Sequence, residues 1–413
     1  KSLTVDERGL TSTQVVAYIN NNSMARLHTE TIPTSTLAAT ARVVDGFVTT
    51  QSDHSGISSS FTRAYTATGI TQTATDGRGN TTTTHTDLAG RSISSTDAAG
   101  NSTTTVYDEA FDAPSVITNA QGKTSCYKYD LRGRKVAEWG TAIQPALFSY
   151  DDADNLTALT TFRADRGDIT TDPSERADGD TTTWAYHPAA GVELSKTYAD
   201  NSQVVKTYDA FNRPATETNA RGIVKTLSYD AATGQLTGIS FSDDETPSQS
   251  FAYNILGQLT QVTDAAGTRT IAYNEYSERQ SDSLDSGAHT HLVTELRDNY
   301  GRSTGFTYAR SGSTQFTTSV GYATDGRIAT AGFMHGGVNR QFSYGYLSGS
   351  NLLHTLTQPN GLTLTQSYEE HRDLLTDMQY HRGSTLVVER SYSYDTLGRP
   401  TNRSTARQGS VKN

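Results

Sequence analysis

The chain has 413 residues, which is longer than one ordinary domain, yet only 34% of its residues are hydrophobic and 19% are charged. This low hydrophobic content argues against a compact globule with a thick core, and the 22 tyrosines and abundant threonines argue against disorder. The net charge of −10 argues against nucleic-acid binding. The single cysteine, Cys126, excludes an intrachain disulfide and is interpreted as a strand residue. No apolar run reaches the ~18 residues of a membrane span.

In chain order, residues 1–70 hold degenerate copies of a repeat that becomes regular over residues 71–162. Regular copies open with a Tyr-Asp pair: Tyr107, Tyr129 and Tyr150 are spaced 22 and 21 residues apart. A Gly-Arg pair follows the opening, and a second turn of the form Asx-x-x-Gly divides each copy. A fixed period of about 20 to 50 residues is typical of a repeat architecture.

Residues 163–183 interrupt the repeat with an acidic, proline-containing segment. Its carboxylates could bind calcium, but they lack EF-hand spacing, so an excursion loop is the favoured interpretation and a calcium site the alternative. Regular copies resume over residues 184–280, and residues 281–299 form a second predicted excursion. Both excursions are expected to protrude from the sheet. Residues 300–413 keep strand-like alternation with a divergent consensus, and Asn360-Gly361 predicts a hairpin there.

Each repeat is predicted to be a β-hairpin. The runs between turns are β-branched and aromatic, the turns begin with Asp or Asn, and glycine supplies their positive φ. About 30 strands of this kind form a ribbon too long to stay flat, because open sheets beyond about ten strands curl and strand twist has a fixed hand. The sequence therefore predicts an all-β chain with helix below about a tenth, in which consecutive antiparallel hairpins form a spiral sheet around a cavity.

The repeat Tyr-Asp-x-x-Gly-Arg, followed by Thr-Asp-x-x-Gly, resembles the YD repeat of the Rhs family, which includes bacterial Rhs proteins, the B and C components of insecticidal Tc toxins, and teneurins. The resemblance covers nearly the whole chain and is strongest over residues 71–275 and 392–400. It implies a hollow shell or barrel that encapsulates or presents an effector (toxin) domain in a secreted or cell-surface bacterial protein. The implied partners are that effector domain or other segments of a larger protein, and surface carbohydrate is a further candidate. Because both ends fall inside repeat-like sequence, we expect the chain to be a piece of a longer protein.

The signature residues are expected to be structural. We expect the tyrosines to stack between neighbouring hairpins, the Asp to cap its turn, and the Arg to stack on a tyrosine or pair with a carboxylate. These residues are Tyr107, Asp108, Tyr129, Asp130, Gly133, Arg134, Tyr208, Asp209, Tyr229, Asp230, Tyr394, Asp395, Gly398 and Arg399.

Candidate catalytic residues must lie outside this consensus. His335, Asn339, Arg340 and Tyr344 combine a base with charge-neutralising groups, as polysaccharide β-elimination requires. The alternative function is therefore a carbohydrate-binding or lyase-like protein with a groove lined by Tyr, His and Arg. His289 and His291 would share a strand face, but no third metal ligand is evident. No nucleophile, metal-protease or cofactor fingerprint is present, so the main prediction is a scaffold with no catalytic residue, metal or cofactor.

Overall fold

The computed structural model describes residues 2–5, 10–19, 22–163, 170–407 and 410–412. It divides into two compact units. Unit 1 comprises residues 1–103, 273–281 and 291–413, and unit 2 comprises residues 104–272 and 282–290. The described residues contain 36 strands, and their one helical element is a single 3-10 turn, η2 (Pro173–Glu175). The predicted fold class, an all-β chain of consecutive hairpins, is confirmed.

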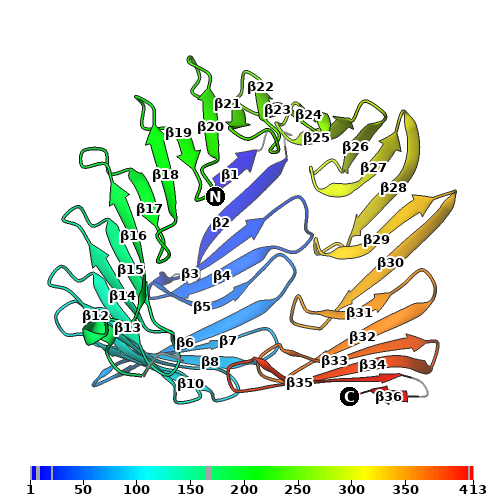
Figure 1. The fold of residues 1–413 in the computed structure, drawn as a ribbon. Helices are drawn as coiled ribbons and strands as arrows, with labels where there is room; N and C mark the ends of the chain where they lie inside the picture. Colours follow the sequence, from blue (N-terminus) through cyan, green and yellow to red (C-terminus); the bar gives the residue numbers. More distant parts are fainter. Residues whose placement is uncertain (1, 6–9, 20–21, 164–169, 408–409, 413) are drawn as a thin grey trace. The chain divides into compact units, whose positions relative to one another are not determined.

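In unit 1, each strand from β1 to β9 pairs antiparallel with its neighbour in the chain, and so does each strand from β27 to β36 (Figure 1). The first run is β1 (Ser2–Val5), β2 (Thr11–Ile19), β3 (Asn22–Thr31), β4 (Ala39–Val44), β5 (Phe47–Ser52), β6 (Ser58–Thr66), β7 (Gly69–Thr75), β8 (Thr81–Asp87) and β9 (Ser92–Thr96). The second run is β27 (Ser303–Arg310), β28 (Ser313–Tyr322), β29 (Ile328–His335), β30 (Val338–Tyr346), β31 (Leu353–Thr357), β32 (Leu362–Tyr368), β33 (Leu375–Arg382), β34 (Thr385–Tyr394), β35 (Pro400–Arg407) and β36 (Ser410–Lys412).

Unit 2 is built the same way from shorter strands. They are β11 (Pro114–Thr118), β12 (Thr124–Tyr129), β13 (Lys135–Trp139), β14 (Ala146–Tyr150), β15 (Leu156–Thr161), β16 (Asp180–Tyr186), β17 (Glu193–Thr197), β18 (Gln203–Tyr208), β19 (Pro214–Thr218), β20 (Val224–Tyr229), β21 (Leu236–Phe241), β22 (Gln249–Tyr253) and β23 (Leu259–Asp264). Residues of β10 (Ser102–Tyr107), β24 (Gly267–Tyr273), β25 (Arg279–Asp285) and β26 (Thr290–Arg297) are shared between the two units.

The chain buries little apolar surface. Its accessible surface is 24136 Å², whereas a compact monomer of 44.6 kDa would expose roughly 15,600 Å². The buried hydrophobic residues among those described are Ala25, Ala137, Ala146, Phe162 and Leu364. A thick core is therefore not what holds the hairpins together, and the backbone ladders and turn contacts must do so.

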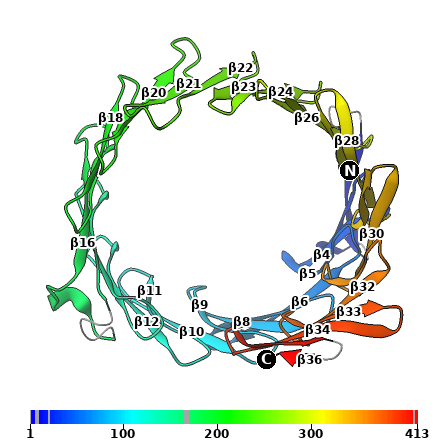
Figure 2. The ribbon, with the colours of Figure 1, turned by 45° about the vertical axis from the view of Figure 1, so that its right-hand side comes forward.

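The two faces of the unit 2 sheet differ in composition because side chains alternate along each strand. One face, here called the tyrosine face, carries the signature tyrosines and three ion pairs: Lys135–Glu138, Lys206–Glu193 and Lys225–Glu217. On the opposite threonine face, the register-paired positions from β16 to β23 hold only Thr, Ser, Ala, Gly, Val and Gln. The strands of unit 2 follow an arc in Figure 2, with η2 on its outer side.

The segment that contains η2 lies against the threonine face. Lys128, on that face, donates through Nζ to Asp172 at 3.1 Å and to Ser174 at 3.2 Å. Pro173 is buried here, and Ala137, beside Lys128 in the register, is fully buried. Since η2 lies on the outer side of the arc, the threonine face of unit 2 is convex and the tyrosine face is concave (Figure 2).

In unit 1, turns of the second run of strands pack against turns of the first run, an interface that we call the seam (Figure 1). The backbone N–H of Thr36 donates to Thr324 O at 2.9 Å, and Arg302 Nη1 donates to Thr34 O at 3.3 Å. Arg78 forms an ion pair with Asp373 and donates to Glu369 O at 3.2 Å. Chain segments almost 300 residues apart, such as Arg78 and Asp373 with a separation of 295, are joined in this way.

The seam also requires glycine at the point where the backbones of Gly77 and Gly349 lie against each other. Gly349 has φ +71°, and a Cβ added there would collide with the carbonyl oxygen of Gly77. A Cβ at Gly77 would collide with the carbonyl oxygen of Gly349 in return. Beside this point, Phe61, Ala98 and Leu397 line a hollow of about 500 Å³.

The predicted excursions need correction. Residues 281–285 belong to β25 and residues 290–297 to β26. The prediction that residues 281–299 form an excursion is therefore wrong, because most of this segment is strand. Its consensus is lost, but its alternation of apolar and polar residues still suits a pleated sheet. Of the first excursion, residues 164–169 lie outside the described residues. Residues 170–179 leave the strand pattern, and β16 has already begun at Asp180.

The Asn360-Gly361 pair lies in the predicted hairpin, between β31 and β32. The loop has four residues and not two: Gln358 N donates to Leu362 O at 2.8 Å, and Gly361 N donates to Gln358 O at 3.0 Å.

We expect Gly349→Ala to destabilise the protein more than Gly361→Ala. Both positions have positive φ (+71° and +78°), but only Gly349 faces another chain segment, whereas Gly361 has nothing within 4 Å. The strain of φ costs about 1–2 kcal/mol in either variant, and the collision across the seam adds roughly 1–3 kcal/mol to Gly349→Ala. Urea unfolding measures both. Equal losses in the two variants would contradict the seam.

Candidate functional site

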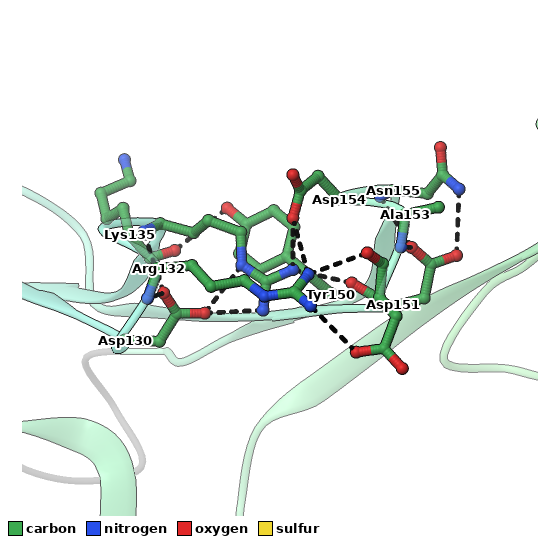
Figure 3. A network of polar contacts seen from close by, with 10 residues as sticks. Asp130, Arg132, Lys135, Tyr150, Asp151, Ala153, Asp154 and Asn155 are labelled. Carbon is green, nitrogen blue, oxygen red and sulfur yellow. Dashed lines mark hydrogen bonds and ion pairs between the residues drawn. The ribbon is translucent and has the colours of Figure 1, made fainter.

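The signature Asp of each repeat closes its own turn. Asp130 N donates to Arg134 O at 3.0 Å, and Gly133 N donates to Asp130 O at 2.9 Å. Asp130 Oδ1 accepts from the backbone N–H groups of Arg132 at 2.9 Å and Arg134 at 3.0 Å (Figure 3). Gly133, with φ +77°, supplies the left-handed position that ends the turn. In other copies Asn212 and Asp154 take that conformation, which Asn and Asp tolerate better than most residues.

The signature Arg joins this turn to the next hairpin. Arg134 Nε donates to Asp130 Oδ2 at 2.7 Å, and the guanidinium carbon lies 4.9 Å from the ring centroid of Tyr150, at the end of β14. Arg134 Nη1 also donates to Asp151 O at 2.7 Å and to Asp154 at 2.8 Å. One guanidinium thus binds the acid of its own hairpin and both the ring and the turn of the following one.

The signature Tyr completes the contact from the other side. The hydroxyl of Tyr150 donates to Lys135 O at 3.0 Å (Figure 3). Lys135 directly follows Arg134, so the ring and the hydroxyl of one tyrosine bind adjacent residues of the preceding hairpin. We call the set of Asp, Arg and following Tyr the interlock.

The interlock recurs in both units. In unit 2, Arg213 binds Asp209 at 2.7 Å and lies 4.4 Å from the Tyr229 ring, whose hydroxyl donates to Pro214 O at 2.8 Å. In unit 1, Arg302 binds Asp298 at 2.8 Å and lies 4.2 Å from Tyr322. The tyrosine hydroxyl also donates to a backbone carbonyl in these further copies: Tyr129 to Pro114, Tyr208 to Glu193, Tyr322 to Ser303, Tyr346 to Ile328, Tyr368 to Leu353 and Tyr394 to Leu375.

These contacts shift the ionisation of the residues that make them. The pKa of Asp395 is lowered to about 2, chiefly because its carboxylate accepts a hydrogen bond from the backbone N–H of Arg399. Partial burial raises this pKa, and the hydrogen bond from the Arg399 side chain lowers it further. The pKa values of Asp87, Asp130, Asp209 and Asp298 are likewise lowered. Burial raises the pKa of Tyr129 and Tyr394. The interlock therefore holds an ionised carboxylate and a neutral phenol at neutral pH.

Sequence reasoning anticipated the turn-capping Asp and the two alternatives for Arg, both of which occur. It missed the role of the tyrosine hydroxyl, and it expected rings to stack between hairpins. At Tyr150 and Tyr229 the ring is covered by a guanidinium instead. The available signal was the equal spacing from Arg134 to Tyr150 and from Arg213 to Tyr229, 16 residues in both cases.

The rival catalytic group is not brought together as a set: Arg340 lies on the face of His335, but Asn339 and Tyr344 are kept apart from them. His335 ends β29 and stands opposite Val338 in the register, while Asn339 projects from the other face of β30. Tyr344 shares the His335 face but lies six positions beyond Val338, roughly 20 Å along the strand. Arg340 stacks loosely over Phe333, at 6.0 Å. A shallow hollow of about 320 Å³ beside His335 is lined by Phe316, Thr318 and Phe333, without the other three candidates.

The other candidates also have structural environments. His291 Nδ1 lies 2.7 Å from the Tyr308 hydroxyl, while His289 lies in the turn before β26. Within the described ranges no group of three or more His, Cys, Asp or Glu side chains is arranged to hold a metal ion. Cys126 is half-buried in β12. No helix in the part of the chain that the structure describes is long and apolar enough to cross a membrane.

We expect Tyr229→Phe to lower the free energy of unfolding by about 1 kcal/mol, the net value of one intramolecular hydrogen bond. The change removes the hydroxyl that donates to Pro214 O and leaves the ring under Arg213. Tyr65→Phe is the matched control, because Tyr65 is 74% exposed and should change stability by less than about 0.5 kcal/mol. Equal effects in chemical denaturation would contradict the role of the hydroxyl.

Stability should fall in acid as the interlock carboxylates become protonated. The folded pKa of Asp395 lies below its ordinary value of 3.8, so its contribution is present above that value and is lost as the pH falls towards 2. Asp395→Asn should keep the turn, because Asn254 caps the same kind of turn through Leu256 N and Gln258 N. This variant should have a shallower acid slope in unfolding measured between neutral pH and pH about 2. An unchanged slope would show that Asp395 does not contribute.

Known proteins resemble this chain in one repeat segment and in the fold. Residues 229–270 match the family model for the RHS Repeat. A search of curated proteins finds no match. Among solved structures, the chain is similar to a TcdB2–TccC3–Cdc42 crystal structure, with TM-score 0.68 and 15% identity over 97% of this chain and 23% of the other.

Two further structures agree. TcdB2–TccC3 without its hypervariable C-terminal region gives TM-score 0.69 and 14% identity, and the Photorhabdus luminescens Tc holotoxin pore gives 0.67 and 14%. Each match covers 97% of this chain and 22% of the other, so the chain spans under a quarter of these relatives. At this identity the likeness shows the fold. The family-model match is confined to residues 229–270, and the likeness over 97% of the chain is a likeness of fold.

Proposed function

We propose that this chain is a wall segment of a YD-repeat shell in a secreted or cell-surface bacterial protein, and that the shell encapsulates or presents an effector (toxin) domain. The observation that carries the proposal is the interlock. The guanidinium groups of Arg134, Arg213 and Arg302 each lie over the tyrosine ring of the next hairpin. A residue set that is repeated to bind hairpin to hairpin serves a wall, whereas a catalytic or ligand site would be formed once.

The two faces of unit 2 support this role. The concave tyrosine face carries large side chains such as Trp184 and Phe148, and it carries Lys–Glu ion pairs such as Lys206–Glu193. A curved surface of aromatic groups and neutralised charges suits a polypeptide held against it without a single specific site. The convex threonine face is suited to solvent, because hydroxyl groups can exchange hydrogen bonds with water at little cost.

The solved relatives add a further support. Three of them contain TccC3, and one is described as lacking a hypervariable C-terminal region. By analogy, the repeat would form the wall and a variable segment would be its cargo. No observation favours the lyase alternative, since His335, Asn339 and Tyr344 do not converge.

The test joins a protease-sensitive reporter domain to the chain after Asn413. We expect the reporter to be cleaved at least about tenfold more slowly than the same reporter on a short linker, because access requires local opening. The variant Arg134→Ala/Arg213→Ala should lose that protection. Cleavage as fast as in the linker control would contradict encapsulation.

The same preparation tests the alternative. Incubation with uronic-acid polysaccharides, followed by ultraviolet absorbance, detects the unsaturated product of β-elimination. We expect no rise. A rise that His335→Ala or Tyr344→Phe abolishes would replace the wall with an enzyme.

A further inference from the structure

Charge is segregated between the two faces of the sheet in the second run of unit 1. The acids within strands β27 to β35 are Asp377 and Glu389, and both lie on one face. All the arginines of these strands lie on the other face, which also carries Tyr346 and Tyr394 and is the counterpart of the tyrosine face of unit 2. We call it the arginine face, and its cations are Arg310, Arg340, Arg382, Arg390, Arg403 and Arg407.

These arginines lack the partners that other cations of the chain have. In the interlock, Arg134 binds Asp130, and three lysines on the tyrosine face of unit 2 pair with glutamate. Among the described residues, no cation of the arginine face forms a hydrogen bond or an ion pair, and Arg340 alone contacts a ring, that of Phe333 at 6.0 Å. The positive charge of this face is therefore not neutralised within the described sheet.

Arg390 lies at the centre of the densest part of the arginine face. It stands opposite Thr405 in the register of β34 and β35, so Arg403 and Arg407 lie diagonally on either side of it, at roughly 7 Å. Like charges at this distance repel each other. In addition, Arg390 Nε is buried and has no hydrogen-bond partner in the part of the chain that the structure describes, which is destabilising for a charged group.

The sheet itself does not supply the anion that this cluster needs. Both strands that flank Arg390 are present, and its register neighbours are Met378 on β33 and Thr405 on β35, neither of which is charged. A counter-charge can therefore reach Arg390 only from above the face. This argument does not depend on exposure at the turns or at the ends of the chain.

The arginine face is elongated, and its shape selects the kind of anion. From β27 to β35 it extends over eight strand spacings, or roughly 38 Å. A single small anion meets a few of these groups, whereas an extended polyanion can meet them all. The guanidinium fork matches a carboxylate with two hydrogen bonds. Carboxylates at alternate positions of an extended polypeptide are roughly 7 Å apart, which matches the diagonal spacing around Arg390.

We infer that the arginine face binds an acidic, extended segment of the polypeptide that the shell encloses, through guanidinium–carboxylate pairs. The inference rests on the proposed function, because the arginine face is the counterpart of the concave face on which unit 2 would hold its cargo. It adds a charge preference to that function. The tyrosine face of unit 2 neutralises cations such as Lys206 with its own glutamates, whereas the arginine face leaves this task to the bound segment.

The test is fluorescence anisotropy of the whole chain with a labelled decapeptide of alternating glutamate and threonine. We expect binding that weakens as salt is raised, because salt screens exposed charges. Peptides with glutamine or lysine in place of glutamate should bind at least about tenfold more weakly, equivalent to about 1.4 kcal/mol. Equal binding of the glutamine peptide, or no binding of the glutamate peptide at low salt, would overturn the inference.

A matched pair of variants locates the site. Arg403→Gln/Arg407→Gln removes two exposed cations of the arginine face and should weaken binding of the glutamate peptide at least about tenfold. Lys123→Gln/Arg221→Gln removes two exposed cations from turns of unit 2 and should change binding by less than about twofold. Equal losses in the two variants would show only a general effect of net charge and would overturn the assignment. Circular dichroism verifies that both variants fold.

Two further outcomes separate this inference from its alternatives. Guanidinium groups also bind phosphates, so a labelled single-stranded oligothymidine of ten nucleotides serves as a competitor. Tighter binding of that oligonucleotide than of the glutamate peptide would replace the acidic polypeptide with a nucleic acid. The peptide assay needs no reporter domain. Protection of the reporter without peptide binding would therefore contradict this inference alone, and peptide binding without protection would contradict the enclosure.

Discussion

A guanidinium placed between two hairpins is the interaction on which the structure depends. A sheet with few buried hydrophobic residues, such as Ala137 and Phe162, gains little from a core. Each hairpin must therefore be held by its neighbours in the chain. Arg134 does this by bonding to Asp130 behind it and covering Tyr150 ahead of it. A charge-assisted hydrogen bond contributes about 1.5–3 kcal/mol and a cation–π contact about 0.5–2 kcal/mol, and recurrence multiplies these modest contributions.

The interlock explains why the repeat has its length. The tyrosine must follow the arginine by one hairpin so that its ring lies under the guanidinium and its hydroxyl meets the carbonyl of the next residue, as Tyr229 meets Pro214. The interval is 16 residues for Arg134–Tyr150 and Arg213–Tyr229 and 20 for Arg302–Tyr322, where the hairpin strands are longer and the ring still lies 4.2 Å from the guanidinium. The η2 segment is inserted between β15 and β16, outside an Arg-to-Tyr interval such as that of Arg134 and Tyr150, and it folds back on the threonine face through Lys128.

Much of this was predictable from sequence, because hairpins are local. Asp130 and Gly133 specify their turn within five residues, and the period gave the order of strands. The seam was not predictable: nothing local relates Arg78 to Asp373, 295 residues away. The proposed group around His335 failed for a related reason, because proximity in sequence is not proximity on a strand, and alternation sends Asn339 to the opposite face. The strands within residues 281–299 do not follow from the repeat consensus, because this segment keeps only the apolar–polar alternation of a strand.

A double-mutant cycle on Arg213 and Tyr229 tests the central claim most directly. Arg213→Met and Tyr229→Leu each remove one partner, and urea unfolding of the parent, both single variants and the double variant isolates their interaction. A coupling free energy of about 0.5–2 kcal/mol is predicted, because the guanidinium lies 4.4 Å from the ring. Additive losses, with coupling within about 0.3 kcal/mol of zero, would show that the two hairpins are not joined through this pair.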